Sequence, residues 1–303
     1  MMNIVIIHTG FAKYLVYTLK KLKTTNKNAS IFLISDREYK EYSQYSTFVD
    51  IKKVTKEEAI TFKNKYIHLG KSDPNYEMFC MQRWIILKDF MKEYNINECF
   101  HIDSDVLLFS DLNEVLKPFV KYDISLANKL ALTMYIRNIK VLEEFSKYLL
   151  FKYTDEKEIN KLKSMYYDDP NRLNNGVAGS ISDMDISREF FSQTNFQVGN
   201  LSEIENDSIF DFAILYGSPN FEMLKKDKYE MKKIYFENDI PFCNYSKDGI
   251  NKKIRFHSLH FLVWTKPYMK KLANNIDLNF NPYYINIYRE LTVFKNKIKK
   301  LFN

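Results

Sequence analysis

A short apolar segment interrupted by two acids limits what this chain can fold into. Residues 99–112 read CFHIDSDVLLFSDL, in which the apolar residues stop at Asp103 and Asp105 and resume directly afterwards. Side chains two positions apart in a strand point the same way, so both carboxylates face one point at the end of a buried strand. Two anions brought together in a half-buried place need a cation between them. The pattern therefore predicts a Mg²⁺ or Mn²⁺ site that carries a diphosphate.

The surroundings of this triplet distinguish it from a chance occurrence. A second Asp-x-Asp triplet, Asp183-Met184-Asp185, lies elsewhere in the same chain. Only the first has a predicted strand before it and an apolar run after it, and open α/β sheets bind ligands at the carboxyl ends of their strands. The alternative interpretation is a strand end with two solvated acids.

The beginning of the chain predicts an α/β fold. Residues 3–8 form a β-branched run, residues 14–22 place apolar side chains at helical spacing, and residues 31–34 form a second apolar run. This strand, helix and strand order is typical of a parallel sheet. The first turn contains Gly10 and no other glycine, so the GxGxxG fingerprint of dinucleotide-binding proteins is absent.

The middle of the chain continues the alternation of helices and strands. We expect a third short strand at 51–54, helices at 56–65, 76–94, 112–121 and 138–152, a strand at 122–126 and a charged link at 154–164. Residues 203–248 mix strands and turns without a motif.

Composition narrows the class of protein. The chain has 303 residues, enough for one large domain with a sizeable core, and a formal net charge of +7, which favours anionic partners such as nucleotide diphosphates. Its three cysteines are widely spaced, which indicates a reducing compartment. No apolar run reaches the roughly 18 residues of a membrane span, and the start lacks the features of a signal peptide. We therefore expect a cytoplasmic protein.

Three further places carry candidate functional residues. Arg83 lies in a strongly apolar helix and must either reach water or find an anionic partner, for which a bound diphosphate or a carboxylate such as Glu77 would serve. The loop at 174–180 contains glycines and amides, and with Asp183 it is able to hold sugar hydroxyls; a plain turn capped by Ser182 or Asp183 is the alternative.

The late segment 255–269, RFHSLHFLVWTKPYM, offers a third metal ligand. His257 and His260 are both candidates for a nitrogen ligand, and Lys266 is able to pair with phosphates. Beyond it, residues 283–302 form an apolar helical stripe followed by lysines, which predicts either a helix lying on an anionic membrane surface or a terminal helix docked on its own domain.

With these motifs, the chain resembles the GT-A class of nucleotide-sugar glycosyltransferases. Within that class it is similar to bacterial transferases of surface polysaccharide assembly and to the glycogenin and galactosyltransferase group. There, a strand ending in Asp-x-Asp binds Mn²⁺ or Mg²⁺ with the sugar diphosphate, and a late His-x-x-Gly-x-x-Lys-Pro-Trp supplies a metal ligand and a phosphate-binding lysine. Here the late motif corresponds to His260, Lys266, Pro267 and Tyr268, with Val263 where glycine is usual.

The resemblance implies an architecture and a set of roles. It implies an α/β fold with a Rossmann-like, mixed, mainly parallel central sheet flanked by helices, a catalytic domain at 1–270 (nucleotide-binding half about 1–112, acceptor-side half 113–270) and a basic helical extension at 271–303. It assigns the nucleoside pocket to Thr9, Gly10 and Asp36, the donor phosphates or base to Arg83, Ser104 and Lys266, the metal to Asp103, Asp105 and His260, and the acceptor sugars to Asn175, Gly176 and Asp183.

The implied activity is transfer of a sugar from a nucleoside diphosphate, expected to be a UDP-sugar, to a carbohydrate or lipid-linked acceptor, with no nucleic acid as partner. Asp183 is the general base if the reaction inverts configuration, and no base is required if it retains it. One alternative is a phosphatase of the haloacid dehalogenase type with Asp103 as nucleophile. Another is a non-catalytic protein that binds nucleic acid or a membrane surface through its basic charge.

Overall fold

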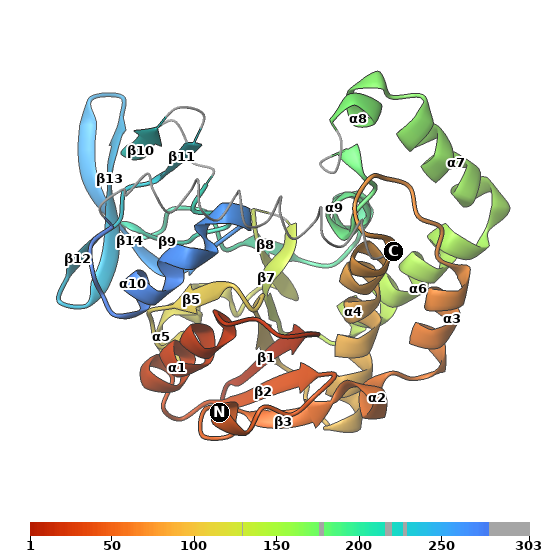
Figure 1. Cartoon of the computed structure of the whole chain (residues 1–303), viewed down its shortest axis with the longest axis horizontal. Helices are drawn as coiled ribbons and strands as arrows, with labels where there is room; N and C mark the ends of the chain where they lie inside the picture. The colour runs from red at the N-terminus through yellow and green to blue at the C-terminus, as the bar shows by residue number, and fades with distance from the viewer. Residues whose placement is uncertain (129, 176–178, 216–219, 227–228, 279–303) are drawn as a thin grey trace, which may run out of the picture. The chain divides into compact units, whose positions relative to one another are not determined.

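The computed structural model describes residues 1–128, 130–175, 179–215, 220–226 and 229–278, which form two compact units (Figure 1). The first unit comprises Met1–Gly10, Asn28–Asp103 and Leu116–Leu201, and the second comprises Phe11–Lys27, Ser104–Val115 and the chain from Ser202 onward. The chain passes from the first unit to the second between Asp103 and Ser104, inside the acidic triplet.

A seven-stranded mixed sheet organises the first unit. Four strands, in the order β3-β2-β1-β4, run parallel; β7 is antiparallel to both β4 and β6, and β8 is parallel to β6. The predicted α/β class with a mixed, mainly parallel sheet is confirmed. The strands are β1 (Asn3–His8), β2 (Ser30–Ser35), β3 (Thr47–Asp50), β4 (Cys99–His101), β6 (Ile124–Ala127), β7 (Leu130–Ile136) and β8 (Val198–Asn200).

Helices cover one face of this sheet. The apolar side of α4 packs Trp84, Ile85 and Phe90 against strand residues such as Val5 and Ile34 in one buried cluster. Burial of such side chains contributes about 1.5–3 kcal/mol each, which is why this helix is fully integrated in the core. The helices of this unit are α2 (Ile51–Val54), α3 (Glu57–Lys65), α4 (Pro74–Glu93), α6 (Lys140–Thr154), α7 (Glu156–Tyr167), α8 (Pro170–Asn174) and α9 (Asp183–Gln193), with short 3₁₀ turns η1 (Lys40–Tyr42) and η2 (Lys117–Phe119).

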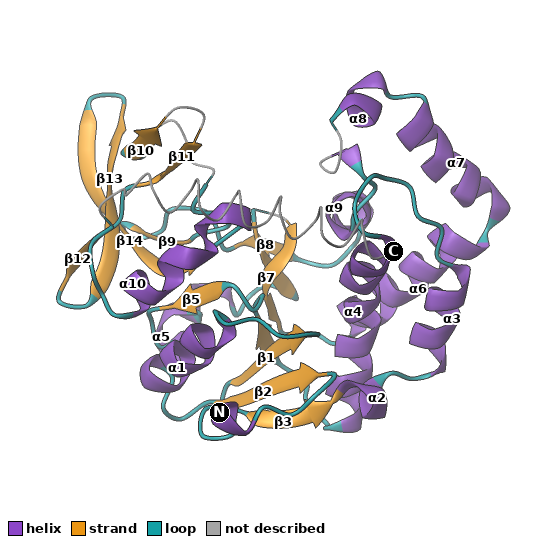
Figure 2. Cartoon of the chain, viewed as in Figure 1, coloured by secondary structure: helices purple, strands orange, loops and turns teal. Residues whose placement is uncertain are grey.

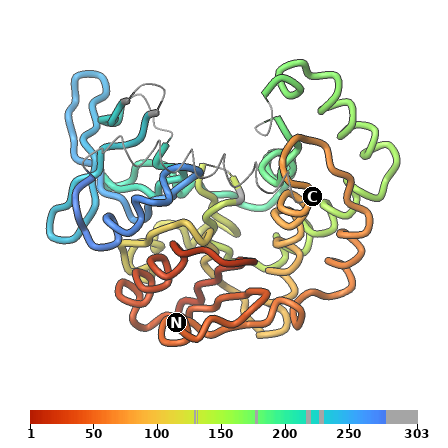
Figure 3. The backbone as a smooth tube through the Cα atoms, in the orientation of Figure 1, coloured from red at the N-terminus to blue at the C-terminus, as the bar shows by residue number. Residues whose placement is uncertain are grey.

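The second unit is built on a smaller sheet with the order β12-β13-β14-β5, and β9 lies parallel beside β14 (Figure 2). Its strands are β5 (Val106–Leu108), β9 (Ser208–Phe210), β12 (Tyr235–Glu237), β13 (Ile240–Lys247) and β14 (Ile250–His260), with a separate hairpin of β10 (Met223–Lys226) and β11 (Tyr229–Lys232). Its helices are α1 (Leu15–Thr25), α5 (Leu112–Val115), η4 (Val263–Tyr268) and α10 (Met269–Ala273). The colours along the backbone show that α1, β5 and β14 come from distant parts of the sequence (Figure 3).

Two local predictions were wrong, and one strand was missed. The segment predicted as a strand at 51–54 is helix α2, because the Asp50 side chain accepts a hydrogen bond from the Lys52 N–H and caps a helix there; the strand β3 lies directly before it. The segment predicted as a charged link is the helix α7, capped by Asp155. The strand β7 was not predicted at all.

The C-terminal segment is described only in part. The structure describes α10 and the chain up to Leu278, so the predicted helix at 283–302 lies outside the described residues. In the described part of the chain, no helix combines the length and the apolar character that crossing a bilayer requires. The predicted division near residue 112 into nucleotide-binding and acceptor-side halves concerns ligands and stays a prediction.

Candidate active site

The carboxyl ends of three parallel strands gather predicted site residues at one edge of the first unit's sheet. Strand β1 pairs in parallel with both β2 and β4, so the three strands end at the same edge. Thr9 follows β1 directly, Asp36 follows β2, and Asp103 comes two residues after β4. This is the edge at which open α/β sheets bind ligands.

Gly10 and Asp36, both predicted for the nucleoside pocket, are joined by a hydrogen bond. The Gly10 N–H donates to the Asp36 Oδ1 at 3.0 Å, and the Tyr39 hydroxyl donates to the Gly10 carbonyl at 2.6 Å. Gly10 has a φ of +77°, a left-handed conformation that favours glycine. Burial raises the pKa of Asp36, but the Gly10 N–H and the Arg37 charge outweigh it and lower that pKa, so Asp36 stays a carboxylate.

Arg83 joins two predicted acids of the first unit. Its guanidinium lies 2.5 Å from the Asp103 Oδ1 and 3.0 Å from the Asp183 Oδ2, and the Trp84 indole N–H also donates to that Asp183 oxygen, at 3.2 Å. Arg83 is 8% exposed and Asp183 5%. An anionic partner was one of the two expectations for this arginine, and two carboxylates fill that role.

Helix α9 presents Asp183 to Arg83. Ser182 is the N-cap of α9 and forms a capping box with Asp185, which decides the open question of which residue caps this helix. Asp183 therefore occupies the first helical position with its carboxylate directed at the arginine. Burial raises the pKa of Asp183 and Asp103 adds to the rise, while Arg83 opposes it.

Two aromatic residues that the sequence did not single out complete this part of the site. Trp84 places its ring 4.4 Å from the Arg83 guanidinium and its indole N–H on Asp183. His101 is fully buried, packs edge-on against Trp84 and lies 3.9 Å from the Asp103 carboxylate. Burial first, and then the Arg83 charge, lowers the pKa of His101 to about 3, so its ring is neutral. Both residues read as ordinary core positions in the sequence.

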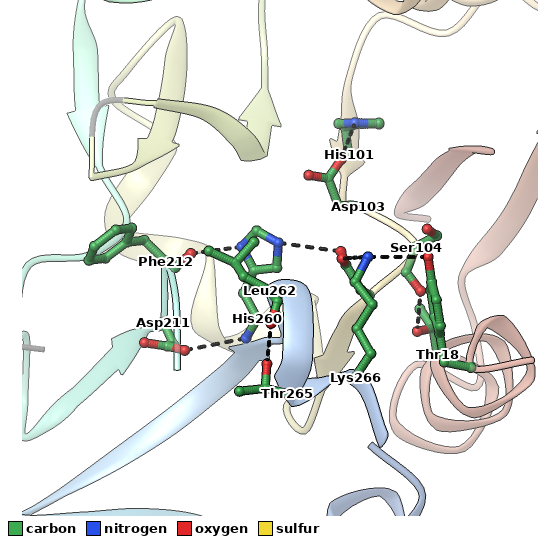
Figure 4. A network of polar contacts seen from close by, with 12 residues as sticks. Thr18, His101, Asp103, Ser104, Asp211, Phe212, His260, Leu262, Thr265 and Lys266 are labelled. Atoms are coloured by element: carbon green, nitrogen blue, oxygen red, sulfur yellow. Dashed lines mark hydrogen bonds and ion pairs between the residues drawn. The ribbon is translucent and has the colours of Figure 1, made fainter. Parts of the chain in front are cut away.

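In the second unit, one carboxylate faces an imidazole and an ammonium. The Asp105 Oδ1 lies 3.3 Å from the His260 Nε2, and the Asp105 Oδ2 lies 2.8 Å from the Lys266 Nζ (Figure 4). Strand pairing causes this meeting, because His260 at the end of β14 lies opposite Val106 at the start of β5. The turn η4 then returns the chain so that Lys266 reaches the same carboxylate. Asp105, His260 and Lys266 therefore meet in the second unit, and their predicted roles toward a metal and a diphosphate stay predictions.

The hydrogen bond on the far side of the imidazole shows which nitrogen faces Asp105. The His260 Nδ1 lies 2.7 Å from the Phe212 carbonyl oxygen. A carbonyl only accepts, so Nδ1 carries a proton and Nε2 faces the Asp105 oxygen. In the charged ring Nε2–H donates to this carboxylate, and in the neutral ring Nε2 offers a lone pair that, together with the carboxylate oxygen, fits a divalent ion such as Mn²⁺.

The charges of Asp105 and Lys266 are fixed by their surroundings. Burial alone would raise the pKa of Asp105, but His260 and Lys266 lower it well below its usual range. Burial alone would lower the pKa of Lys266, but Asp105 and then the Tyr14 hydroxyl, 3.4 Å from its Nζ, raise it above its ordinary value. The carboxylate and the ammonium both remain charged. Tyr14, at the start of α1, was not predicted as a site residue.

The structure decides between the two candidate histidines. The His257 Nδ1 lies 2.9 Å from the Ser110 hydroxyl and its ring packs on Phe210, while His260 lies beside Asp105. Burial lowers the pKa of His257 to about 4, as expected for a neutral packing residue. His260 is therefore the candidate ligand.

The remaining predicted residues have less distinctive surroundings. Ser104 is buried, and its carbonyl accepts a hydrogen bond from the Thr18 hydroxyl at 2.8 Å, which anchors the triplet to α1 within the second unit. Asn175 is exposed at the end of α8. Gly176 lies outside the described residues, and Thr9 is exposed. Nothing in the structure tests their predicted roles.

Val263, which stands where the resembled motif has glycine, has a φ of +47°. A β-branched residue is strained in this left-handed region by about 1–2 kcal/mol, and its side chain is 71% exposed, so packing does not compensate. We therefore expect Val263→Gly to raise the free energy of unfolding by about 1 kcal/mol, measured by urea denaturation, since relief of strain exceeds the entropy cost of glycine. The matched control is Val120→Gly, an exposed valine with ordinary backbone angles, which should lower stability; equal effects at both positions would contradict the prediction.

Comparisons with known proteins find similarity only among solved structures. No protein-family profile matches the chain, and no curated protein matches it by sequence. The glycosyltransferase GlyE of Streptococcus pneumoniae TIGR4 is 16% identical over 71% of this chain, with a TM-score of 0.37, and this chain spans about half (47%) of its length.

Two other similar structures are matched over more of their length. Mouse xyloside xylosyltransferase 1 is 12% identical over 70% of this chain and 88% of its own, with a TM-score of 0.44. The galactosyltransferase LgtC, solved with donor and acceptor sugar analogues, is 10% identical over 93% of this chain and 99% of its own, with a TM-score of 0.43. All three are glycosyltransferases, the class that the motifs resemble. Because the identities and TM-scores are low, the function proposed below rests on this chain's own side chains.

Proposed function

We propose that this chain is a metal-dependent glycosyltransferase that moves a sugar from a nucleoside diphosphate to a glycan or lipid-linked acceptor in surface polysaccharide synthesis. The observation that carries the proposal is the meeting of Asp105, His260 and Lys266. A carboxylate and an imidazole lone pair suit a divalent ion, and an ammonium beside them suits the phosphates that such an ion binds. The expected donor is a UDP-sugar.

The proposed metal ligands are Asp105 and His260, joined by Asp103. Asp103 precedes Asp105 by two residues, so the chain itself keeps it near, and it would contact either the ion or the ribose. The ion would be Mn²⁺ or Mg²⁺, and when bound it would stabilise negative charge on the departing diphosphate. The low pKa of Asp105 keeps this ligand ionised without the metal.

Lys266 is the proposed phosphate-binding residue. Its ammonium is held by Asp105 at 2.8 Å and by Tyr14, and its side chain is 25% exposed, so it is accessible to a ligand. Placing a fixed positive charge where the diphosphate leaves lowers the barrier without any reorganisation at the moment of reaction. Thr9, Gly10 and Asp36 would line the nucleoside pocket, and Ser104 would lie beside the diphosphate.

Asp183 is proposed to act on the acceptor side, and Arg83 near the donor phosphates or base. The raised pKa of Asp183 suits proton acceptance, so it would serve as general base if the reaction inverts configuration. If the reaction retains configuration, Asp183 would instead hold Arg83 in place for the donor. Asn175 and Gly176 would contact the acceptor. We further propose a cytoplasmic location with membrane contact through residues 283–302, and no nucleic acid partner.

A thermal-shift screen tests the proposal directly. A bound donor should raise the melting temperature, because ligand at 100 times its Kd stabilises the folded state by about 2.7 kcal/mol. We expect a UDP-sugar with Mn²⁺ to produce this shift, and the same sugar with EDTA to lose most of it. The Lys266→Met variant should show a smaller shift, since it lacks the ammonium that pairs with the phosphates.

Two outcomes would overturn the proposal. No shift with any nucleotide sugar, together with a phosphoaspartate trapped on Asp103, would identify a phosphatase instead. Steeply salt-dependent binding to nucleic acid without nucleotide-sugar binding would identify a binding protein.

A further inference from the structure

One buried ammonium binds the two residues on either side of Phe212, one through its carboxylate and the other through its carbonyl oxygen. The Lys232 Nζ, from the end of β11, lies 2.9 Å from the Asp211 carboxylate and 2.6 Å from the Ala213 carbonyl oxygen. Lys232 is 3% exposed and Asp211 2%, so water does not replace these contacts. Because the residues before and after Phe212 are both bound by the same group, the Phe212 carbonyl between them has a fixed direction.

The same segment holds His260 at several atoms. The Phe212 carbonyl accepts from the His260 Nδ1 at 2.7 Å, and the Asp211 Oδ2 accepts from the His260 backbone N–H at 3.3 Å (Figure 4). The Ile214 N–H donates to the His260 carbonyl at 2.9 Å. Residues 211–214 therefore position both the imidazole and the backbone of His260. Lys232 in turn holds this segment in place through Asp211 and Ala213.

We propose that Lys232 and Asp211 are positioning residues for His260. By fixing the Phe212 carbonyl they hold the Nδ1 proton in place and turn Nε2 toward Asp105, 3.3 Å away. This inference deepens the proposed function and rests on it, because Nε2 is the proposed metal ligand. Outer contacts of this kind orient ligating histidines in metal sites, and their loss lowers metal affinity 10- to 100-fold as a rule.

A contribution to folding stability does not explain the ion pair of Lys232 and Asp211. Taking a lysine and an aspartate out of water costs about as much as their attraction returns, and apolar residues of similar volume serve as well. A second buried pair, Lys152 with Glu158, joins neighbouring helices of the first unit. The ion pair of Lys232 and Asp211 is different because Lys232 binds Asp211 and Ala213, and Phe212 between these two residues binds His260.

The experiment compares the tautomer of His260 and the affinity for Mn²⁺ in the wild type and in Lys232→Met/Asp211→Asn, which removes both charges together. Long-range proton–nitrogen spectra of histidine-labelled protein report the tautomer, and His260→Gln assigns the signal. We expect Nδ1–H in the wild type and a mixture with Nε2–H in the variant. Electron paramagnetic resonance of free Mn²⁺, with UDP present, measures how tightly each protein binds the ion. We expect the variant to bind Mn²⁺ at least about tenfold more weakly than the wild type.

The matched control is Lys152→Met/Glu158→Gln, which removes a buried pair in the first unit and should leave both readouts unchanged. An unchanged tautomer and affinity in the Lys232 and Asp211 variant would overturn the inference. If that variant does not fold, the wild type still decides, because an Nε2–H tautomer there would overturn the inference. A wild type that shows Nδ1–H but binds no Mn²⁺ would contradict the proposed function and leave the positioning of His260 standing.

Discussion

An Asp105→Ala variant should lose metal-dependent hydrolysis of the sugar donor by about 10²- to 10³-fold or more, the usual cost of removing one electrostatic contact to the developing charge. Asp105 is the one side chain that contacts both His260 and Lys266 in the second unit as described, so its removal takes away a ligand and the partner of the ammonium at once. Donor hydrolysis followed by release of nucleoside diphosphate, over a range of Mn²⁺ concentrations, measures the effect.

A nearby exposed acid, Asp111, provides the control for this prediction. Asp111→Ala removes an exposed acid near by in sequence, whose carboxylate accepts from the Asn113 N–H, and it should leave hydrolysis unchanged. Asp105→Asn keeps the shape of the side chain and should behave like Asp105→Ala, because the charge is what matters. Full turnover in both Asp105→Ala and His260→Ala would remove the proposed mechanism.

Local patterns, together with the resemblance, singled out most of the residues that meet in the second unit. A strand that stops at Asp105 and a later segment with His260 and Lys266 each carry polar groups that an apolar setting does not explain. Strand pairing between β5 and β14 then brings them together. The choice between His257 and His260 needed the structure, because it depends on which of them lies beside Asp105 and which beside Ser110.

No sequence pattern marked the residues that are proposed to position a site residue, such as Lys232. Lys232 lies in a lysine-rich stretch where each lysine looks like a solvated one, and only the structure shows that it is buried against Asp211. The strand β3 was displaced by four residues for a related reason, since an Asp50 side chain that caps a helix is indistinguishable in sequence from one that ends a strand. Contacts between distant segments, such as the pairing of β3 with β2, decide such cases, and a local pattern does not contain them.

Replacing Arg83 with methionine should lower the free energy of unfolding at neutral pH by about 3–5 kcal/mol, the usual cost of leaving buried charge without its partner. Two carboxylates, Asp103 and Asp183, would then lie in a buried place without the cation that now contacts both. The loss should shrink as the pH falls. The pKa of Asp183 is already raised in the folded protein and would rise further, so the folded variant takes up protons before the unfolded chain does and gains stability on acidification.

Urea denaturation at several pH values measures this prediction, and an exposed pair supplies its control. Arg137 lies 3.6 Å from Glu98 in the same unit, and the two side chains are 37% and 41% exposed, so water solvates the acid when the arginine is removed. Arg137→Met should therefore cost only about 1 kcal/mol or less. If Arg83→Met were no more destabilising than this control, or if its effect did not diminish at lower pH, the two acids would not depend on Arg83 for their charge. The contacts of Arg83 to Asp103 and Asp183 would then have no structural role. Arg83 would be able to leave both acids and bind the donor without loss of stability.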